Sequence, residues 1–563
     1  MVFLGVTGLA KRSEKSKAAK KPRKKSSTKK SAPVKSSAPE EELVDHTTHS
    51  DAQIEQARTV GRGLSSEDAE LKTGESLIRE YKYKTNGIPI RVRIIDSPDS
   101  YVPLYIVSIA QVSETTAFIL ERIRKEIAKQ VSFGMVDIVN VKKTGIIEER
   151  FKETIDLLLA KYFPDADDET VAFLKAYLIQ KSLGLGDLEI VMSDGMLEEI
   201  AINASSECVW VYHREHGWLR TNVYLESEEQ IKHYASIMGR KVGRQITVLE
   251  PLMDANLDGG DRVNATLQPI SLSGNTITLR KVSDKPWTIT DFLQAGTINV
   301  EAAALIWLAI QYELSALVAG GTASGKTSML NVVANFFPPS QRILTIEDTH
   351  EIRLPSFLHW VPMITRLPNP EGKGGISMLH LLVNALRQRP DRILVGEVRR
   401  AAEAEVLFEA IHTGHSVYAT IHANSAKETI TRLTNPPIEV PKTMLPALSL
   451  VIVQYRNRRT GKRRTFQVAE IAEDGSENVL MQYSTTKDKL ESVNKSKVLF
   501  KTIELYTGLS HKDIEKDLKE KEQVLDYLVK NKIATVETVG RVMAEYYTNP
   551  ERLRKAMRAG KRV

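Results

Sequence analysis

The sequence has almost no cysteine and no long run of apolar residues. Its 563 residues include one cysteine, Cys208, which excludes an internal disulfide framework and a cysteine-rich zinc site. No stretch approaches the roughly 18 consecutive apolar residues of a membrane-spanning helix, so we expect a chain that does not cross a bilayer. Residues 1–10 are mildly apolar, but no basic region precedes them and Lys11 and Arg12 follow, which argues against a secretory signal. These absences favour a protein of the reducing cytoplasm.

Positive charge is concentrated near the start of the chain. The formal net charge is +7, but residues 11–35 hold twelve Lys or Arg against the single acid Glu14, a net +11 that leaves −4 for the rest. Because residues 11–40 are rich in Lys, Ser, Ala and Pro and nearly free of apolar side chains, we expect them to be disordered. Such a tail could bind anionic lipid, RNA or DNA by charge attraction, or simply aid solubility.

Hydrophobic periodicity and composition change along the chain and divide it into several parts. Its length corresponds to about three or four domains. From residue 287 to about 475, apolar strand candidates alternate with helical patterns, which is typical of βα units around a largely parallel sheet. Residues 262–267 and 275–281 alternate like paired strands, and residues 283–286 combine turn formers with Pro286, which predicts a hinge. Ser510 and Asp513 form a possible capping box at the start of a C-terminal helix. The expected parts are a basic, largely disordered tail and linker (1–74), a mostly helical module that opens with a small β element (75–183), an α+β domain (184–283), an α/β nucleotide domain (284–475) and a helical C-terminal extension (476–563).

A glycine-rich segment between an apolar strand and a helix predicts a phosphate-binding loop. The apolar run 314–318 precedes the segment, and residues 328–336 can continue as a helix whose positive N-terminus faces the phosphates. In this pattern small residues let backbone N–H groups surround the phosphates, Lys326 reaches the β and γ oxygens, and Thr327 can hold Mg²⁺. ATP with Mg²⁺ is therefore the expected ligand, and an ordinary glycine-rich turn is the alternative. The loop residues are Gly320, Gly321, Thr322, Ala323, Ser324, Gly325, Lys326, Thr327 and Ser328.

Three further apolar runs of this domain end in chemically useful side chains. Residues 342–346 are followed by Glu347 and Asp348, residues 392–396 by Glu397, and residues 416–421 by His422. Ligands of parallel sheets bind beyond the carboxyl ends of the strands, so these groups should meet near the phosphate loop. A carboxylate that orients water or supports the metal, next to a lysine and Mg²⁺, suits phosphoryl transfer to water. Each polar residue alone could simply mark a strand leaving the core, and for His422 this structural interpretation is the commoner one.

At these residues the chain resembles the secretion and pilus-assembly ATPases of the type II/type IV secretion superfamily. The resemblance covers roughly residues 180–475, and its motifs occur in the order of the family. They are the phosphate loop (320–327), an acidic box (345–351), an atypical second nucleotide motif (389–399), a histidine box (414–424) and the opening of the family's N-terminal α+β domain (183–189 with 197–203).

The resemblance implies a ring, usually a hexamer, in which the α+β domain of one subunit closes over nucleotide held by a RecA-like domain. Arg262 and Arg280 match the basic positions that approach the phosphates, although solvent-facing strand charge is the alternative. By the same resemblance Glu347 is the leading candidate for general base or for positioning water. Glu397 would support metal and water, and His422 would couple the γ-phosphate to domain movement. The expected fold is thus α/β: a RecA-like P-loop ATPase domain preceded by an α+β domain and a helical module, with helices after it.

Some features depart from the bacterial members of that family. The bacterial branch often carries a four-cysteine zinc insert, which this chain lacks. The basic tail, the N-terminal helical module, residues 435–438 and the C-terminal helices look more like the archaeal branch, which includes archaellum and type IV pilus motors.

The leading hypothesis is a cytoplasmic, membrane-peripheral ATPase that works on a polytopic membrane platform protein to assemble pilin-like subunits or drive secretion. A conjugation-type or nucleic-acid-translocating motor that uses the basic tail is the first alternative, although the acidic balance of the folded part argues against it. A regulatory scaffold without hydrolysis is the second, and the intact set of Lys326, Thr327, Glu347 and Glu397 argues against it.

Overall fold

The computed structural model describes residues 71, 73–109, 114–130, 141–257, 259–282, 285–368 and 372–562. The predictions for the basic tail and for the first half of the hinge, residues 283 and 284, lie outside these ranges. The described residues belong to one compact unit. Among them, no helix combines the length and the apolar character needed to span a membrane.

The N-terminal half of the described chain is built on one nine-stranded sheet, in the order β1-β2-β3-β6-β5-β4-β9-β8-β7. All neighbouring strands are antiparallel except β3 and β6. In β2 the residues Ile88, Ile90, Val92 and Ile94 are fully buried at every second position, which is the period of a strand with one face on a core. The strands are β1 (Ser76–Thr85), β2 (Ile88–Asp96), β3 (Leu104–Ile109), β4 (Leu197–Ile202), β5 (Cys208–His213), β6 (Gly217–Tyr224), β7 (Leu252–Asn256), β8 (Arg262–Thr266) and β9 (Thr276–Arg280).

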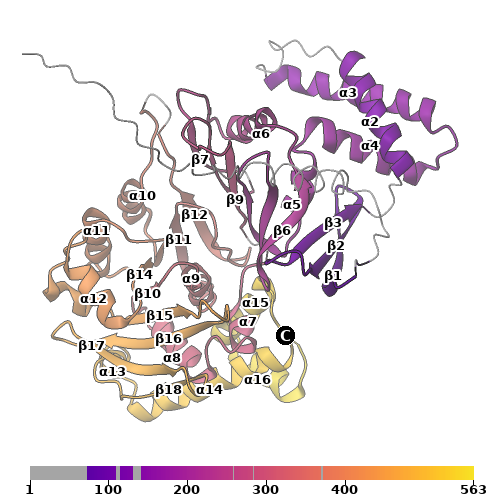
Figure 1. Ribbon diagram of the computed structural model, residues 1–563. Coiled ribbons are helices and arrows are strands. Elements are labelled where there is room, and N and C mark those ends of the chain that lie inside the picture. The colour runs from indigo at the N-terminus through magenta and orange to yellow at the C-terminus, as the bar shows by residue number, and fades with distance from the viewer. Residues whose placement is uncertain are drawn as a thin grey trace, which may run out of the picture. The chain divides into compact units, whose positions relative to one another are not determined.

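The N-terminal sheet crosses the predicted boundary at residues 183 and 184. The pairing of β3 with β6 joins the early strands to the predicted α+β domain, and both share one hydrophobic core with the helices between them. Strand pairing over more than 100 residues leaves no trace in local periodicity. The module does contain helices, as predicted, and three of them pack on one another (Figure 1). They are α2 (Glu114–Gln130), α3 (Val141–Tyr162) and α4 (Asp168–Leu183), followed by α5 (Asp187–Met192) and α6 (Glu228–Lys241).

A second nine-stranded sheet carries the phosphate loop, in the order β12-β11-β13-β14-β10-β15-β16-β17-β18. The strands from β12 to β15 are parallel, and those from β15 to β18 are antiparallel. Every residue of β10 and β14 is buried, as expected for parallel strands covered on both faces. The strands are β10 (Ala316–Gly320), β11 (Arg342–Glu347), β12 (His359–Ile364), β13 (Arg392–Val395), β14 (Ser416–Ile421), β15 (Leu450–Arg456), β16 (Arg463–Ile471), β17 (Glu477–Ser484) and β18 (Lys489–Ser492).

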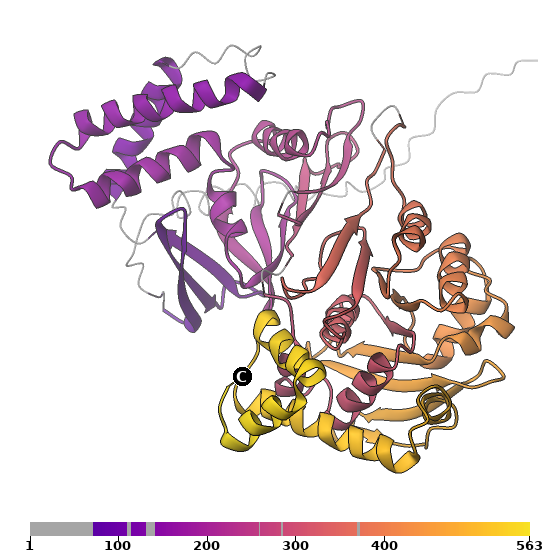
Figure 2. The same ribbon diagram turned by 180° about the vertical axis from the view of Figure 1, so that it is seen from behind.

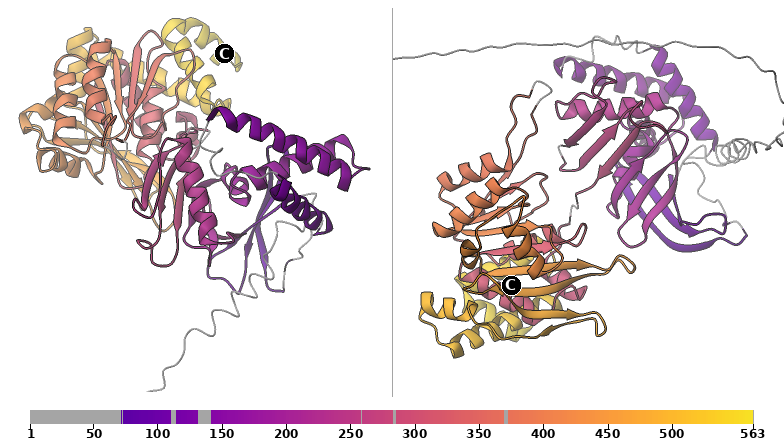
Figure 3. Two further views of the ribbon diagram at one scale, coloured as in Figure 1. Left: turned by 90° about the horizontal axis from the view of Figure 1, so that it is seen from above. Right: turned by 60° about the vertical axis from the view of Figure 1, so that its left-hand side comes forward.

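The sheet continues past residue 475 and so also crosses the predicted boundary there. Strands β17 and β18 extend the sheet, and the C-terminal helices begin only at α13 (Leu499–Thr507). In Figure 3 these strands are orange and the C-terminal helices beside them yellow. The remaining helices are α7 (Ile289–Gln294), α8 (Val300–Gln311), α9 (Lys326–Ala334), α10 (Met378–Ala385), α11 (Ala401–His412), α12 (Ala426–Thr434), α14 (His511–Lys530), α15 (Val536–Thr548) and α16 (Pro550–Ala559), with short 3₁₀ turns η2 (Leu386–Gln388) and η3 (Lys442–Ala447).

The C-terminal helices are part of the core of the second sheet. Helix α14 packs along the buried helix α8 (Figure 2). On α8, Trp307 stacks on Phe336 with ring centroids 5.4 Å apart and donates a 2.8 Å hydrogen bond to the hydroxyl of Tyr547 on α15. The capping box of Ser510 and Asp513 is present at the start of α14, as predicted. These helices therefore stabilise the layer beneath the phosphate loop.

Candidate functional site

The phosphate loop joins β10 to α9, and its backbone requires glycine at two positions. Gly325 has a φ of +94°, which only glycine adopts without strain. A Cβ on Gly320 would lie 2.6 Å from the carbonyl oxygen of Gln454 on β15, too close for any side chain. Inside the loop, Lys326 Nζ donates to the carbonyl of Gly321 at 3.0 Å, and Ser324 Oγ donates to the same oxygen at 2.8 Å. The sequence-predicted loop thus has the strand, turn and helix geometry of a phosphate cradle.

The ammonium group of Lys326 lies in the field of an acid from the neighbouring strand. Burial lowers the pKa of Lys326, and the negative charge of Glu397 acts in the opposite direction as the largest opposing influence. Glu397 follows β13, which is separated from β10 by β14 alone. The structure therefore brings Glu397 and Lys326 to the same edge of the sheet, as the sequence predicted.

Glu397 lies between two further polar side chains. Its Oε1 is 3.3 Å from Nε2 of His422, which follows β14, and its Oε2 accepts a 2.6 Å bond from Arg399. Burial, and then the positive charge of Lys326, lower the pKa of His422, whereas the negative charge of Glu397 opposes them; the balance favours the neutral imidazole. A neutral imidazole has one N–H group, which can donate a hydrogen bond to Glu397 or to a phosphate oxygen. The Glu397 side chain itself keeps 17% of its surface exposed.

Glu347 has a different environment from Glu397, although both follow strands of the same sheet. It is only 2% exposed. Its Oε1 accepts bonds from the backbone N–H groups of Glu351, at 3.0 Å, and Ile352, at 2.9 Å. Its Oε2 is 3.3 Å from Nδ1 of His350. These contacts fix the loop after β11, so the Glu347 carboxylate is engaged by its own loop.

Asp348 joins the acidic box to Glu397 through an arginine. Its Oδ2 accepts a 2.7 Å bond from Arg399, which also binds Glu397, and its Oδ1 accepts from Thr365 at 2.9 Å. Sequence reasoning did not select Arg399, although it stands two residues after Glu397 in the motif 389–399. Its position two residues from a predicted catalytic acid was the sequence signal that could have identified it as a site residue.

The two arginines predicted from the N-terminal sheet reach the phosphate loop. Arg262 on β8 and Arg280 on β9 are direct cross-strand partners. Together with Thr327 and Ser328 they line a cavity of about 140 Å³, whose wall also includes Trp287. Arg262 is held by two bonds to Asp254, at 2.9 and 2.5 Å. Cations from one sheet and the phosphate loop of the other therefore face a shared space.

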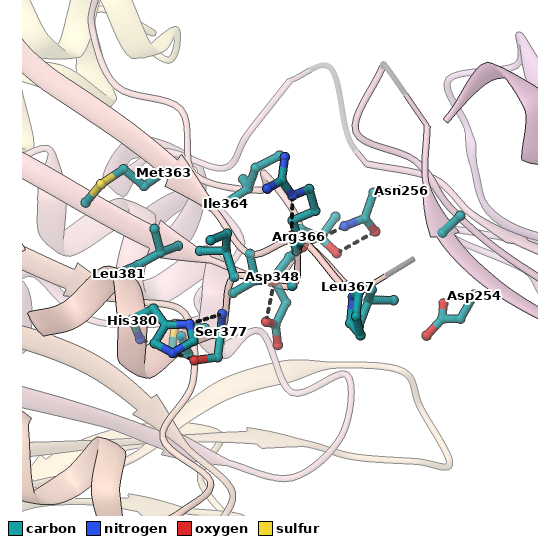
Figure 4. Close-up of a pocket in the computed structure, with 18 of the residues that line it drawn as sticks. Asp254, Asn256, Asp348, Met363, Ile364, Arg366, Leu367, Ser377, His380 and Leu381 are labelled. Atoms are coloured by element: carbon teal, nitrogen blue, oxygen red, sulfur yellow. Dashed lines mark hydrogen bonds between the residues drawn. The ribbon is translucent and has the colours of Figure 1, made fainter. Parts of the chain in front are cut away.

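A larger cavity of about 1110 Å³ lies beside the acids (Figure 4). Among the described residues that line it, none belongs to the phosphate loop 320–328, so the phosphates fit the smaller cavity instead. Figure 4 shows Asn256 reaching the backbone of Asp348, whose carbonyl accepts a 2.6 Å bond from the amide. The lining includes Asp254, Asn256, Asp348, Arg366, Glu397 and Arg399.

Fold and site together define a P-loop ATPase whose nucleotide domain is joined to a second sheet that supplies basic residues. Residues 184–506 match the family model described as "Type II/IV secretion system protein". The chain belongs to this family and is an ATP hydrolase of the secretion ATPase superfamily.

The chain is also similar to several individual proteins. An uncharacterized protein of Methanocaldococcus jannaschii is 33% identical over 399 residues, which are 69% of this chain and 71% of that protein. The type IV secretion system protein PtlH of Bordetella pertussis is 31% identical over 48% of this chain and 88% of its own length. Among solved structures, the ATPase DotB of Legionella pneumophila is 20% identical with a TM-score of 0.37, and the match covers 66% of this chain and 94% of that chain.

Proposed function

We propose that the protein is a hexameric motor that hydrolyses ATP to assemble pilin-like subunits, or to drive secretion, through a type II/type IV pilus-like machine. The observation that carries the proposal is the cavity shared by Arg262 and Arg280 of the N-terminal sheet and Thr327 and Ser328 at the start of α9 in the nucleotide domain. A nucleotide in this cavity contacts both sheets at once. Binding and hydrolysis can then shift the balance between arrangements of the two sheets, which is how a motor converts chemical energy into movement.

The cavity has an apolar side and a positively charged side, which match the base and the phosphates of a nucleotide. Val282, Pro286 and Trp287 give it an apolar side that suits a base, whereas the arginines and the phosphate loop suit the phosphates.

Thr327 and Glu397 offer the hard oxygen atoms that Mg²⁺ prefers. Among the described residues no group of three or more His, Cys, Asp or Glu could hold a metal alone. Mg²⁺ is commonly held by one or two side chains together with substrate phosphates, so this donor set fits it. When bound, the ion would neutralise phosphate charge.

Beside this cavity, we assign Glu397 to orient the attacking water. Its carboxylate is partly exposed and lies in the field of Lys326, whereas Glu347 is buried and occupied by backbone N–H groups. Glu347 instead shapes the loop that carries Asp348 and Thr349. Lys326 and Arg280 stabilise negative charge on the phosphates, and His422 links the phosphate end to Glu397.

Two substitutions test the site. Lys326→Ala should abolish ATP binding and turnover, and Glu397→Gln should abolish turnover while keeping ATP binding, because only the water-orienting charge is lost. The readouts are phosphate release and binding of a fluorescent ATP analogue. Glu405→Gln, which alters an exposed acid on α11, is the matched control and should behave as the unchanged protein. Retained hydrolysis in both site variants would overturn the assignment.

The machine and its membrane partner are a separate part of the proposal. We infer a location at the cytoplasmic face of the membrane, bound to a polytopic platform protein, and membership of the archaeal branch, which the relative in Methanocaldococcus jannaschii supports. Crosslinking in native membranes followed by mass spectrometry should recover such a platform with pilin-like subunits. Light scattering with and without nucleotide tests the hexamer.

A nucleic-acid-translocating motor is the second candidate because the chain has two strongly basic segments. One is the tail of residues 11–35, and the other is the hairpin of residues 456–464, which holds six Lys or Arg. For this candidate, DNA should stimulate hydrolysis in a salt-sensitive way, and deletion of residues 1–40 should remove the stimulation. Hydrolysis unaffected by DNA at low salt would eliminate it.

A further inference from the structure

The basic hairpin between β15 and β16 places one of its arginines on the phosphate loop. Asn457 shapes the turn, because its Oδ1 accepts bonds from the N–H groups of Arg459, at 3.0 Å, and Thr460, at 3.1 Å. Arg464 is engaged by Asp488, at 2.7 Å. Arg463, in contrast, extends from the first position of β16 toward residues 323–325.

Two contacts place Arg463 against the loop. Its Nε donates a 3.0 Å hydrogen bond to the carbonyl oxygen of Ala323. Its Cδ lies 3.8 Å from where a Cβ of Gly325 would stand, so the side chain runs along the loop. Its Nη2 is also 3.7 Å from Oε2 of Glu198 on β4 of the N-terminal sheet. The guanidinium therefore lies between the phosphate loop and the other sheet.

The residue that Arg463 binds has an unusual backbone. Ala323 has a φ of +57°, which costs energy for any residue with a Cβ and persists only where neighbouring contacts enforce it. The peptide between Ala323 and Ser324 is planar and trans, so a fixed carbonyl of Ala323 also fixes the N–H of Ser324, which donates a 3.4 Å hydrogen bond to the carbonyl of Gly321 and so helps to hold the fold of the loop. Backbone N–H groups of such loops are the donors that hold phosphates.

We propose that Arg463 is a positioning residue of the phosphate loop. It holds the Ala323 carbonyl so that the loop N–H groups are oriented before nucleotide arrives, and its ion pair with Glu198 connects the loop to the N-terminal sheet. The inference rests on ATP hydrolysis at this loop and adds a residue that lies 137 positions after Lys326. Since Arg463 contacts backbone, its effect should fall on nucleotide affinity.

The test compares Arg463→Gln with Arg459→Gln, which removes the same charge from the exposed tip of the same hairpin. A charge-assisted hydrogen bond is worth about tenfold in an equilibrium constant. Arg463→Gln should therefore raise the KM for ATP and the Kd of a fluorescent ATP analogue by about tenfold. The kcat at saturating ATP should stay within about twofold of the unchanged protein, since the contact is not with reacting atoms. Arg463→Lys, which keeps a donor and the charge, should recover part of the affinity.

The outcomes separate this inference from the proposed function. If Arg463→Gln and Arg459→Gln both bind and hydrolyse ATP as the unchanged protein does, the inference is wrong while ATP hydrolysis stands. If Arg463→Gln lowers kcat and leaves KM and Kd unchanged, a positioning role is also excluded. Should Arg463→Gln not fold, Arg463→Lys and Glu198→Gln carry the test. Glu198→Gln should raise KM by about twofold because a partly exposed ion pair contributes little, and an unchanged KM would exclude the link to the N-terminal sheet.

Discussion

At the scale of single residues, Arg399 is the cation that lets two acids share one site. It binds Glu397 at 2.6 Å and Asp348 at 2.7 Å. Arg399→Gln should lower kcat by about tenfold or more, because the acids then repel each other and Glu397 loses a charge-assisted bond. The KM for ATP should change less. Steady-state phosphate release measures both constants, and Lys427→Gln on the exposed face of α12 is the control. A kcat equal to that of the control would show that Arg399 does not orient Glu397.

Gly320 tests how closely the phosphate loop must approach its neighbouring strand. A Cβ there would lie 2.6 Å from the carbonyl oxygen of Gln454, so Gly320→Ala must displace the loop from β15. We expect ATP binding to fall by about tenfold or more, since a shift of about 1 Å is enough to misplace catalytic groups. Gly195→Ala is the matched control, because a Cβ there meets no atom within 4 Å. Calorimetric titration with ATP compares the two variants.

At the scale of secondary structure elements, His213 makes the N-terminal sheet sensitive to acid. It ends β5, is fully buried and accepts a 3.1 Å bond from the N–H of Glu215 at Nδ1, which only an unprotonated nitrogen can do. Burial, and then the neighbouring His216, lower its pKa to about 4. The unfolded chain, with a pKa near 6.5, binds the proton more readily, so stability falls as the pH drops from about 6.5 to 4.

The expected loss over this pH window is up to roughly 3 kcal/mol. It is measured as the free energy of unfolding in urea at successive pH values. His213→Gln should lose less stability between pH 6.5 and 4 than the unchanged protein, because glutamine does not titrate. If the free energy of unfolding fell equally with pH in the variant and the unchanged protein, His213 would have an ordinary pKa in the folded protein.

Glu470, near the end of β16, anchors the start of the C-terminal helices. Burial alone would raise the pKa of this carboxyl, but the bonds from the backbone N–H groups of Leu499 and Lys497 outweigh it and lower the pKa. Those bonds are 2.9 and 2.6 Å long, and Ser496 Oγ adds another at 2.8 Å.

Glu470→Gln should lower the free energy of unfolding by roughly 2–3 kcal/mol. The NH₂ group of glutamine would face the buried N–H groups that now donate to the carboxylate and would leave them without an acceptor. Thermal unfolding measures the loss, and exposed Glu473→Gln is the control. Since the site lies elsewhere, ATP turnover per folded molecule should be unchanged. An unfolding temperature equal to that of the control would contradict the anchoring role.

At the scale of the whole molecule, the proposed function requires nucleotide to act on both sheets. In the Glu397→Gln background, which should bind ATP without turnover, ATP should slow hydrogen exchange in residues 321–326 and also in β9. Adding Arg280→Gln should remove the protection of β9 and keep that of the loop, because Arg280 is the contact from that strand. Protection of the loop alone in both proteins would exclude coupling through Arg280.

The strand-end residues show how far sequence reasoning reached. The phosphate loop, Glu397 and His422 were predictable because each follows a local apolar run, and the carboxyl ends of parallel strands meet at one edge. Local alternation also predicted the paired strands β8 and β9. Local patterns could not distinguish Glu347 from Glu397, since the difference lies in which carboxylate meets backbone N–H groups and which meets Lys326 and Arg399.

The sequence by itself determined the family of this protein and the order of its phosphate loop, acids and histidine, because those signals depend on neighbours along the chain. Tertiary structure alone decided which distant segments meet. It paired β3 with β6, extended the second sheet to β18 and placed Arg463 on Ala323. Such contacts join residues that lie far apart along the chain, 140 positions for Arg463 and Ala323 and 240 for Trp307 and Tyr547, and they depend on packing that no local period or composition records.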